Sequence, residues 1–240
     1  MKQIFEGKHF SKTRSYASNL KWILKSNPEI LSEIQNRVEL FAFFLQPYKK
    51  DCLTIAFRNG ERLLVPSDYA FEAVAETVLM NIYRFEVPST PTVVVDIGAS
   101  IGDFALLASR FPQTHVYAVE PNVPSFGYLE KNMALNHRKL VRSFNSFADS
   151  NTLVSISKQA GQRIHFLKID CEGSEYELLM NCPHSVLSTV NQIAMEIHDH
   201  VGISKVSLLR HLIDNGFDVS QKRAPGEGHY VYARNHDGDS

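Results

Sequence analysis

The sequence lacks the features of a secreted, zinc-binding or membrane-spanning protein. It has 3 cysteines among 240 residues, and no two of them have the spacing of a metal or redox motif. We therefore expect free thiols in a reducing compartment, which favours a cytoplasmic location. The densest apolar run, VELFAFFL at 38–45, is far shorter than the roughly 20 residues that cross a bilayer. The first residues lack the apolar core of a signal peptide, so we expect neither a secretory leader nor a membrane span.

The chain also has little net charge. Its formal net charge is -1 at pH 7, so no overall field favours a nucleic-acid partner. The first 25 residues differ, because they hold six Lys and Arg residues against a single acid, Glu6. Such a cluster is either a solvated face or a site that attracts an anionic substrate or a membrane surface.

The first third of the sequence predicts helices and a hairpin. Residues 15–45 have a helical pattern that stops near Pro47. Residues 52–66 predict a β-hairpin around Asn59-Gly60, a strong turn signal. Residues 67–83 predict a further helix. We expect residues 1–84 to form a region that packs on or caps the domain after it.

Strands and helices alternate from Val93 onward. We predict strands at 93–97, 115–120, 139–144, 163–170 and 192–198, with a helix after each, and a final hairpin at 217–222 and 229–234. This alternation is typical of an α/β fold with a mostly parallel seven-stranded sheet, here with a terminal antiparallel hairpin. The second domain would cover residues 85–235, leaving 236–240 as a frayed tail.

Acidic residues and glycines follow the predicted parallel strands. Ligands bind at the carboxyl ends of such strands, so these residues are candidates for a site. The first turn reads D-x-G-x-x-x-G from Asp96 to Gly102, unlike the G-x-G-x-x-G of dinucleotide sites, and Asp96 would repel a pyrophosphate. Asp96 suits a ligand that carries an ammonium group, and Glu120 can accept hydrogen bonds from both ribose hydroxyls. The ligand implied has a ribose, an amino-acid part and no phosphate, which fits S-adenosylmethionine.

Four segments resemble one known family. VVVDIGASIGDFALL, VYAVEPN, FLKIDCEGSEYELL and AMEIH together are similar to the FkbM-type methyltransferases, over roughly residues 80–200. The most specific segment is K-I-D-x-E-G-x-E at 168–175. The resemblance implies a Rossmann-like class I methyltransferase fold with S-adenosylmethionine as cofactor.

The resemblance also assigns site residues. Asp96, Gly98 and Gly102 would frame the methionine part, Glu120 the ribose, and Asp170 the sulfonium end. The segment after the second helix is shorter than in the family, so Ser146, Phe147 and Asp149 are only candidates for adenine contact. The complete set of predicted cofactor-binding residues is Asp96, Gly98, Ala99, Gly102, Glu120, Pro121, Asn122 and Asp170.

The expected reaction is O-methylation of a hydroxyl. A base near the transferred methyl must take the hydroxyl proton, and His198 is our first choice, ahead of Glu172 and Glu196. We expect no metal, although His198 and His200 could hold one with Asp170 or Glu196. Two residues of the 168–175 motif have simpler explanations. We interpret Cys171 as an apolar filler and Glu175 as an acid that favours a helix N-terminus.

The acceptor that the resemblance implies is a sugar, a glycosylated compound or a polyketide-like metabolite. Alternatives are a non-catalytic binding or assembly protein that keeps the fold, and an N- or nucleic-acid methyltransferase. No N-P-P-Y motif is present, which disfavours the last of these. We expect a small-molecule partner, no nucleic acid, and leave a homo-oligomer open.

Overall fold

The structure is a computed structural model of the whole chain. It describes residues 28–45, 51–66, 73–86, 90–198, 202–223 and 229–236. Several predictions lie outside these residues: the basic N-terminal cluster, the helical pattern at 15–27, the start of the helix at 67–72, His200 and the tail.

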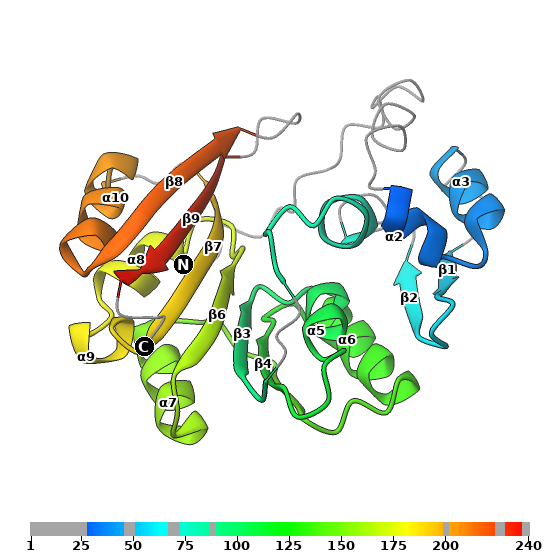
Figure 1. Cartoon of the computed structure of the whole chain (residues 1–240), viewed down its shortest axis with the longest axis horizontal. Helices are drawn as coiled ribbons and strands as arrows, with labels where there is room; N and C mark the ends of the chain where they lie inside the picture. The colour runs from blue at the N-terminus through cyan, green and yellow to red at the C-terminus, as the bar shows by residue number, and fades with distance from the viewer. Residues whose placement is uncertain are drawn as a thin grey trace.

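The central feature is a seven-stranded sheet in the order β5-β4-β3-β6-β7-β9-β8 (Figure 1). The first five strands of this order are parallel, whereas β9 pairs antiparallel with β7 and with β8. This arrangement confirms the predicted Rossmann-like sheet and its terminal hairpin, with every strand ending within two residues of its predicted limits. The strands are β3 Val93–Ile97, β4 His115–Val119, β5 Val141–Phe144, β6 Ile164–Ile169, β7 Val190–Ile197, β8 Phe217–Arg223 and β9 His229–Asn235.

Helices cover both faces of the sheet (Figure 1). Side chains alternate along β3, so Val94 joins one core cluster and Val93 and Val95 join the other. The first cluster includes residues of α5 (Asp103–Ala108) and α6 (Val123–Leu135). The second includes residues of four later helices, which are α7 (Ser150–Ala160), α8 (Glu175–Met180), α9 (His184–Leu187) and α10 (Lys205–Asp214). None of the helices among the described residues has the length and apolar character needed to cross a membrane.

The N-terminal region contains the predicted hairpin, formed by β1 (Cys52–Ala56) and β2 (Arg62–Pro66). The helical pattern before it is divided between two helices, α2 (Pro28–Glu33) and α3 (Arg37–Leu45). Ile34 forms a β-bridge with Phe57, and Asn36 accepts a hydrogen bond from the Ala56 backbone at 2.9 Å. The chain therefore leaves the helix to pair with the hairpin, which local periodicity cannot reveal. The next element, η2 (Ala73–Leu79), is a π-helix.

Two asparagines of α6 attach the hairpin to the rest of the molecule. Asn132 accepts a hydrogen bond from Leu64 N at 2.7 Å and donates to Leu64 O at 3.1 Å and to Ile101 O at 2.8 Å. Asn136 pairs in the same way with both backbone groups of Arg62. The amides thus act as the missing neighbour of an edge strand.

A buried ion cluster strengthens this contact. Glu61 is 7% exposed and pairs with Arg110 at 2.8 Å and with Arg138. Arg110 also contacts Glu33 of α2 at 3.3 Å. The described part of the first 84 residues therefore shares a core and polar contacts with the α/β part, while the boundary at residue 84 stays a prediction.

We expect Asn132→Ala to lower the free energy of unfolding by about 2–4 kcal/mol, because Asn132 is fully buried and its loss leaves three backbone groups without this hydrogen-bond partner. Urea denaturation followed by circular dichroism measures the change. Lys131→Ala, an exposed position on the same helix, should shift stability by less than about 0.5 kcal/mol. Equal effects of the two substitutions would contradict the role of Asn132.

Candidate active site

The predicted site residues meet at one edge of the sheet. Strands β4, β3, β6 and β7 are parallel neighbours, with Ile97 level with Val119 and with Ile169, and Ile169 level with Met195. The residues that follow these strands therefore lie side by side at the carboxyl edge. This is where an open α/β sheet binds its ligand.

The glycines after β3 are required by backbone shape and close packing. Gly98 has φ +74, and a Cβ there would lie 1.7 Å from the carbonyl oxygen of Asp170. Gly102 has φ +82, and its Cβ would lie 2.5 Å from Leu129 Cδ1. Protein atoms thus already fill the space beside both glycines. Contact between this turn and a cofactor stays a prediction, and it would involve the backbone of the turn.

Glu120 fixes this turn to the end of β4. One of its carboxylate oxygens accepts a hydrogen bond from Ser100 N at 2.8 Å, and the other from Asn122 N at 2.7 Å. Burial raises the pKa of Glu120 in spite of these donors. A carboxylate oxygen has two lone pairs, so each oxygen keeps one for a hydroxyl donor. These acceptor oxygens therefore fit the two hydroxyl donors of a ribose diol. Pro121 and Asn122 follow at the start of α6, where Asn122 caps the helix.

Asp96 lies beneath the turn and faces a lysine. It is 0% exposed, and its Oδ1 is 3.1 Å from Lys168 Nζ, although neither carboxylate oxygen has an aligned hydrogen bond. Lys168 Nζ donates to Gly98 O at 2.6 Å. Burial opposes the charge of Lys168, yet Asp96, Asp170 and Asp103 together raise its pKa. The cation that Asp96 meets in the structure is this lysine, and contact with a ligand ammonium stays a prediction.

Asp170, Glu196 and His198 converge beside the turn. Their potential ligand atoms lie within 4.8 Å of one another, and all three residues are partly buried. Asp170 follows β6, Glu196 is the second-last residue of β7, and His198 follows that strand. The expected proximity of these groups is a feature of the structure, whereas their catalytic roles stay untested.

Each member of this cluster is held by another side chain. The Tyr83 hydroxyl donates to Asp170 Oδ2 at 2.8 Å. Glu196 accepts a hydrogen bond from Tyr230, its partner across the β7–β9 ladder.

His198 is held by Glu175. Glu175 Oε1 lies 3.1 Å from His198 Nδ1 and accepts from His198 N at 2.7 Å, and Glu175 is 0% exposed. Glu175 thus does more than favour a helix N-terminus, since it orients the imidazole.

The crowding of acids shifts the pKa values of the cluster. Burial, and then the charge of Asp170, raises the pKa of Glu196 to about 7. Burial would lower the pKa of His198, but its hydrogen bond with Glu175 and the surrounding acids raise it to about 9. His198 is therefore mainly protonated near neutral pH, which weakens it as a general base, and Glu196 is better matched to that task.

The other two motif residues differ in exposure. Glu172 has a side chain that is 72% exposed, and its Oε2 lies 3.6 Å from His198 Nε2. Cys171 is partly buried, and burial raises the pKa of its thiol well above the ordinary value, as an inert filler requires.

The adenine candidates do not form an evident subsite. Asp149 caps α7 by accepting a hydrogen bond from Thr152 N at 2.8 Å, and this bond lowers its pKa. Phe147 is 65% exposed, and Ser146 is also at the surface. Contact with adenine stays a prediction for all three.

The sequence interpretation missed three residues that organise this edge. Lys168 stood inside the quoted motif, and its position two residues before Asp170 was a usable signal. Tyr83 and Tyr230 lie 87 and 60 positions from Asp170, so only the tertiary fold brings them to the cluster.

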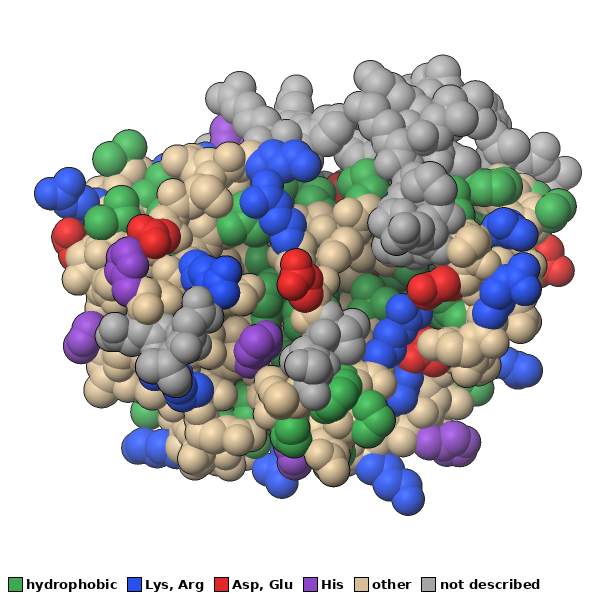
Figure 2. Space-filling view, in the orientation of Figure 1, with side chains coloured by type: hydrophobic (Ala, Val, Ile, Leu, Met, Phe, Trp, Pro, Cys, Tyr) green, Lys and Arg blue, Asp and Glu red, His purple; other side chains and the backbone are tan. Residues whose placement is uncertain are grey.

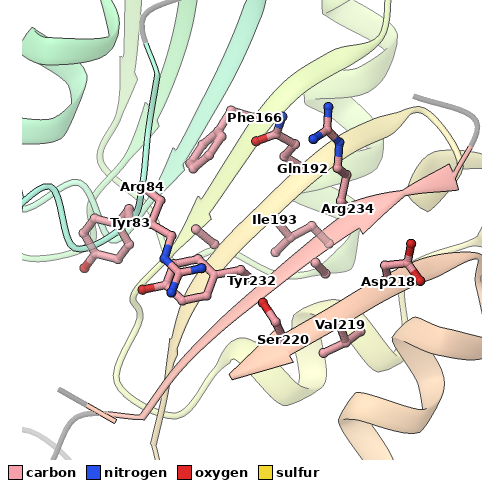
Figure 3. Close-up of a pocket in the computed structure, with 12 residues that line it drawn as sticks. Tyr83, Arg84, Phe166, Gln192, Ile193, Asp218, Val219, Ser220, Tyr232 and Arg234 are labelled. Carbon is pink, nitrogen blue, oxygen red and sulfur yellow. The ribbon is translucent and has the colours of Figure 1, made fainter. Parts of the chain in front are cut away.

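A separate pocket of about 410 Å³ lies on the sheet face (Figure 3). Strands β6, β7, β9 and β8 line it, with the guanidinium of Arg84 stacked 3.9 Å from the ring centre of Tyr232. None of its lining residues is a predicted site residue. Tyr83 connects it to the cluster, because its ring lines the pocket while its hydroxyl reaches Asp170. On this side of the molecule, acidic and basic side chains both occur, with no extended area of one sign among the described residues (Figure 2).

Two solved structures share parts of the fold. TrmK of M. capricolum, in complex with S-adenosyl-homocysteine, is 13% identical with a TM-score of 0.50, and the match covers 65% of this chain and 67% of that one. EvdMO1 is 20% identical with a TM-score of 0.42, over 62% of this chain and 38% of that one.

Two sequence comparisons support the family resemblance. Residues 148–218, less than a third of the chain, match the family described as Methyltransferase FkbM domain. The Sordaria araneosa protein Methyltransferase sdnD is 25% identical over 261 residues, which covers 76% of this chain and 100% of that protein. Both matches agree with the resemblance of the sequence motifs to the FkbM-type S-adenosylmethionine-dependent methyltransferases.

Proposed function

We propose that the chain transfers a methyl group from S-adenosylmethionine to a hydroxyl oxygen of a sugar or sugar-bearing small molecule. The observation that carries this proposal is the placement of Glu120 and the Asp170–Glu196–His198 cluster on either side of one glycine turn. Glu120 offers acceptors to a ribose, and the cluster offers proton acceptors where the reacting oxygen would lie.

The residues divide the work of methyl transfer. The cofactor supplies an electrophilic methyl group. The acceptor oxygen forms the new O–C bond while the S–C bond breaks and its electron pair stays on sulfur. The hydroxyl proton passes to a group of the chain, and the proposed acceptors are Glu196, Glu172 and His198. Alignment of the oxygen with the S–C bond supplies much of the acceleration.

The acceptor class rests on the family resemblance and on charge. A net charge of -1 gives no overall attraction to a phosphate backbone, so a nucleic-acid substrate is disfavoured. A cytoplasmic location, a homo-oligomer and the choice of a hydroxyl oxygen as methyl acceptor stay predictions. The non-catalytic binding protein stays the alternative hypothesis.

We expect Glu120→Gln to weaken binding of S-adenosyl-homocysteine at least tenfold, about 1.4 kcal/mol, because an amide loses the charge and one acceptor that hold the diol. Gln keeps one oxygen for the turn, so the fold should survive. Isothermal titration calorimetry measures the affinity. Glu177→Gln, an exposed position on α8, is the matched control and should bind as wild type does. Undiminished binding to Glu120→Gln would contradict the assignment of the ribose site.

We expect Glu196→Gln to lower the rate of methyl transfer by about 10²-fold or more, with affinity for S-adenosyl-homocysteine changed less than threefold. The amide is nearly isosteric but takes no proton. The measurement is S-adenosyl-homocysteine release with a panel of glycosides and hydroxylated natural products, in comparison with Glu177→Gln. Full activity of Glu196→Gln on an acceptor that wild type methylates would remove Glu196 from the reaction.

A further inference from the structure

We propose that Asp170, Glu196 and His198 bind one divalent cation of the Mg²⁺ and Mn²⁺ class. Their three ligand atoms lie within 4.8 Å of one another. Octahedral ligands at about 2.1 Å lie roughly 3 Å apart when adjacent and about 4.2 Å apart when opposite. Small side-chain rotations therefore bring the three atoms onto a common ion, with coordination positions left for water or substrate.

The second observation is that each ligand is held in place by another side chain, as metal ligands usually are. The hydrogen bond of Tyr83 to Asp170 Oδ2 leaves Oδ1 for an ion. Because His198 Nδ1 contacts Glu175, Nε2 is the ring nitrogen that can bind the ion, which would displace the proton from that nitrogen. Glu196 takes its hydrogen bond from Tyr230, which is 2% exposed.

The local charge also favours a cation. Asp170, Glu196, Glu172 and Glu175 gather around His198, whose two ring nitrogens lie 3.1 Å and 3.6 Å from glutamate oxygens. The nearby Lys168 pairs with Asp96 and donates to a backbone carbonyl. A bound divalent ion would offset the repulsion between Asp170 and Glu196.

The donor set selects the class of ion. Two carboxylates and one imidazole, without a thiolate, suit Mn²⁺ and Mg²⁺ better than structural zinc. Cys171 follows Asp170, but its Sγ faces Glu175 at 3.7 Å. This proposal replaces our initial expectation that the site has no metal.

The catalytic role of the ion, unlike its binding, rests on the proposed function. A hydroxyl oxygen bound to the ion becomes more acidic, because the cation stabilises the alkoxide. In the ion-bound state Glu196 and His198 are ligands, so Glu172 is the one of the three proposed proton acceptors that can still take the proton, and loss of Glu196 would then slow the reaction through the ion. The alkoxide then attacks the methyl carbon, and the electron pair of the S–C bond stays on sulfur.

The test is titration of the purified full chain, freed of metals with a chelator, with Mn²⁺ alone. Electron paramagnetic resonance reports free Mn²⁺, since its signal broadens on binding. We expect one saturable site per chain. Glu196→Gln and His198→Asn should each weaken it at least tenfold, and the milder Tyr230→Phe should weaken it measurably. Glu177→Gln should leave it unchanged.

Binding of S-adenosyl-homocysteine is measured on the same samples, so that the two proposals fail separately. Saturable Mn²⁺ binding without S-adenosyl-homocysteine binding would support the metal site and count against the proposed function. No saturable Mn²⁺ binding to a folded chain would overturn the metal site. Saturable Mn²⁺ binding that persists unchanged in Glu196→Gln, His198→Asn and Tyr230→Phe would also overturn the metal site, because the ion would then bind elsewhere on the surface.

Discussion

The structure of the site depends on the contact between the turn after β3 and the end of β6. Gly98 approaches the carbonyl of Asp170 so closely that no side chain fits, and Lys168 of β6 donates to the carbonyl of Gly98 while it neutralises Asp96. A buried ion pair adds little net stability, but removal of one partner costs about 3–5 kcal/mol. The pair therefore fixes the relative position of two loops, one that carries the predicted cofactor residues and one that begins the acidic cluster.

This constraint explains why the carboxylates at this edge have different environments. Asp96 is wholly buried and paired with Lys168, so a residue of the protein neutralises its charge. Glu120 is also buried, but its partners are backbone donors that leave one lone pair on each carboxylate oxygen. Asp170 and Glu196 lie beside His198, with their potential ligand atoms within 4.8 Å of one another, which makes the cluster the part of the edge best suited to a proton or a cation.

Local sequence predicted the parts of the molecule that local forces determine. The valines of β3 form a buried strand, and Asn59-Gly60 forms a hairpin turn, because these signals act over a few residues. The break at Ile34 came from pairing with Phe57, and the roles of Tyr83 and Tyr230 came from partners far along the chain. Motif spacing placed Asp170, Glu196 and His198 together, but it could not reveal that Glu175 would orient the imidazole.

Tyr83 and Tyr230 show that the N-terminal region and the terminal hairpin both contribute side chains to the acidic cluster. Tyr83 comes from the end of the N-terminal region, and Tyr230 comes from the terminal hairpin, yet their rings lie 6.1 Å apart beside the cluster. Both hydroxyls point at carboxylates of the central strands. Tyr83 also lines the pocket on the sheet face, so one side chain connects that pocket to Asp170. The Asp170–Glu196–His198 cluster and its supporting tyrosines are thus assembled from three distant segments, and both the N-terminal region and the terminal hairpin contribute to it.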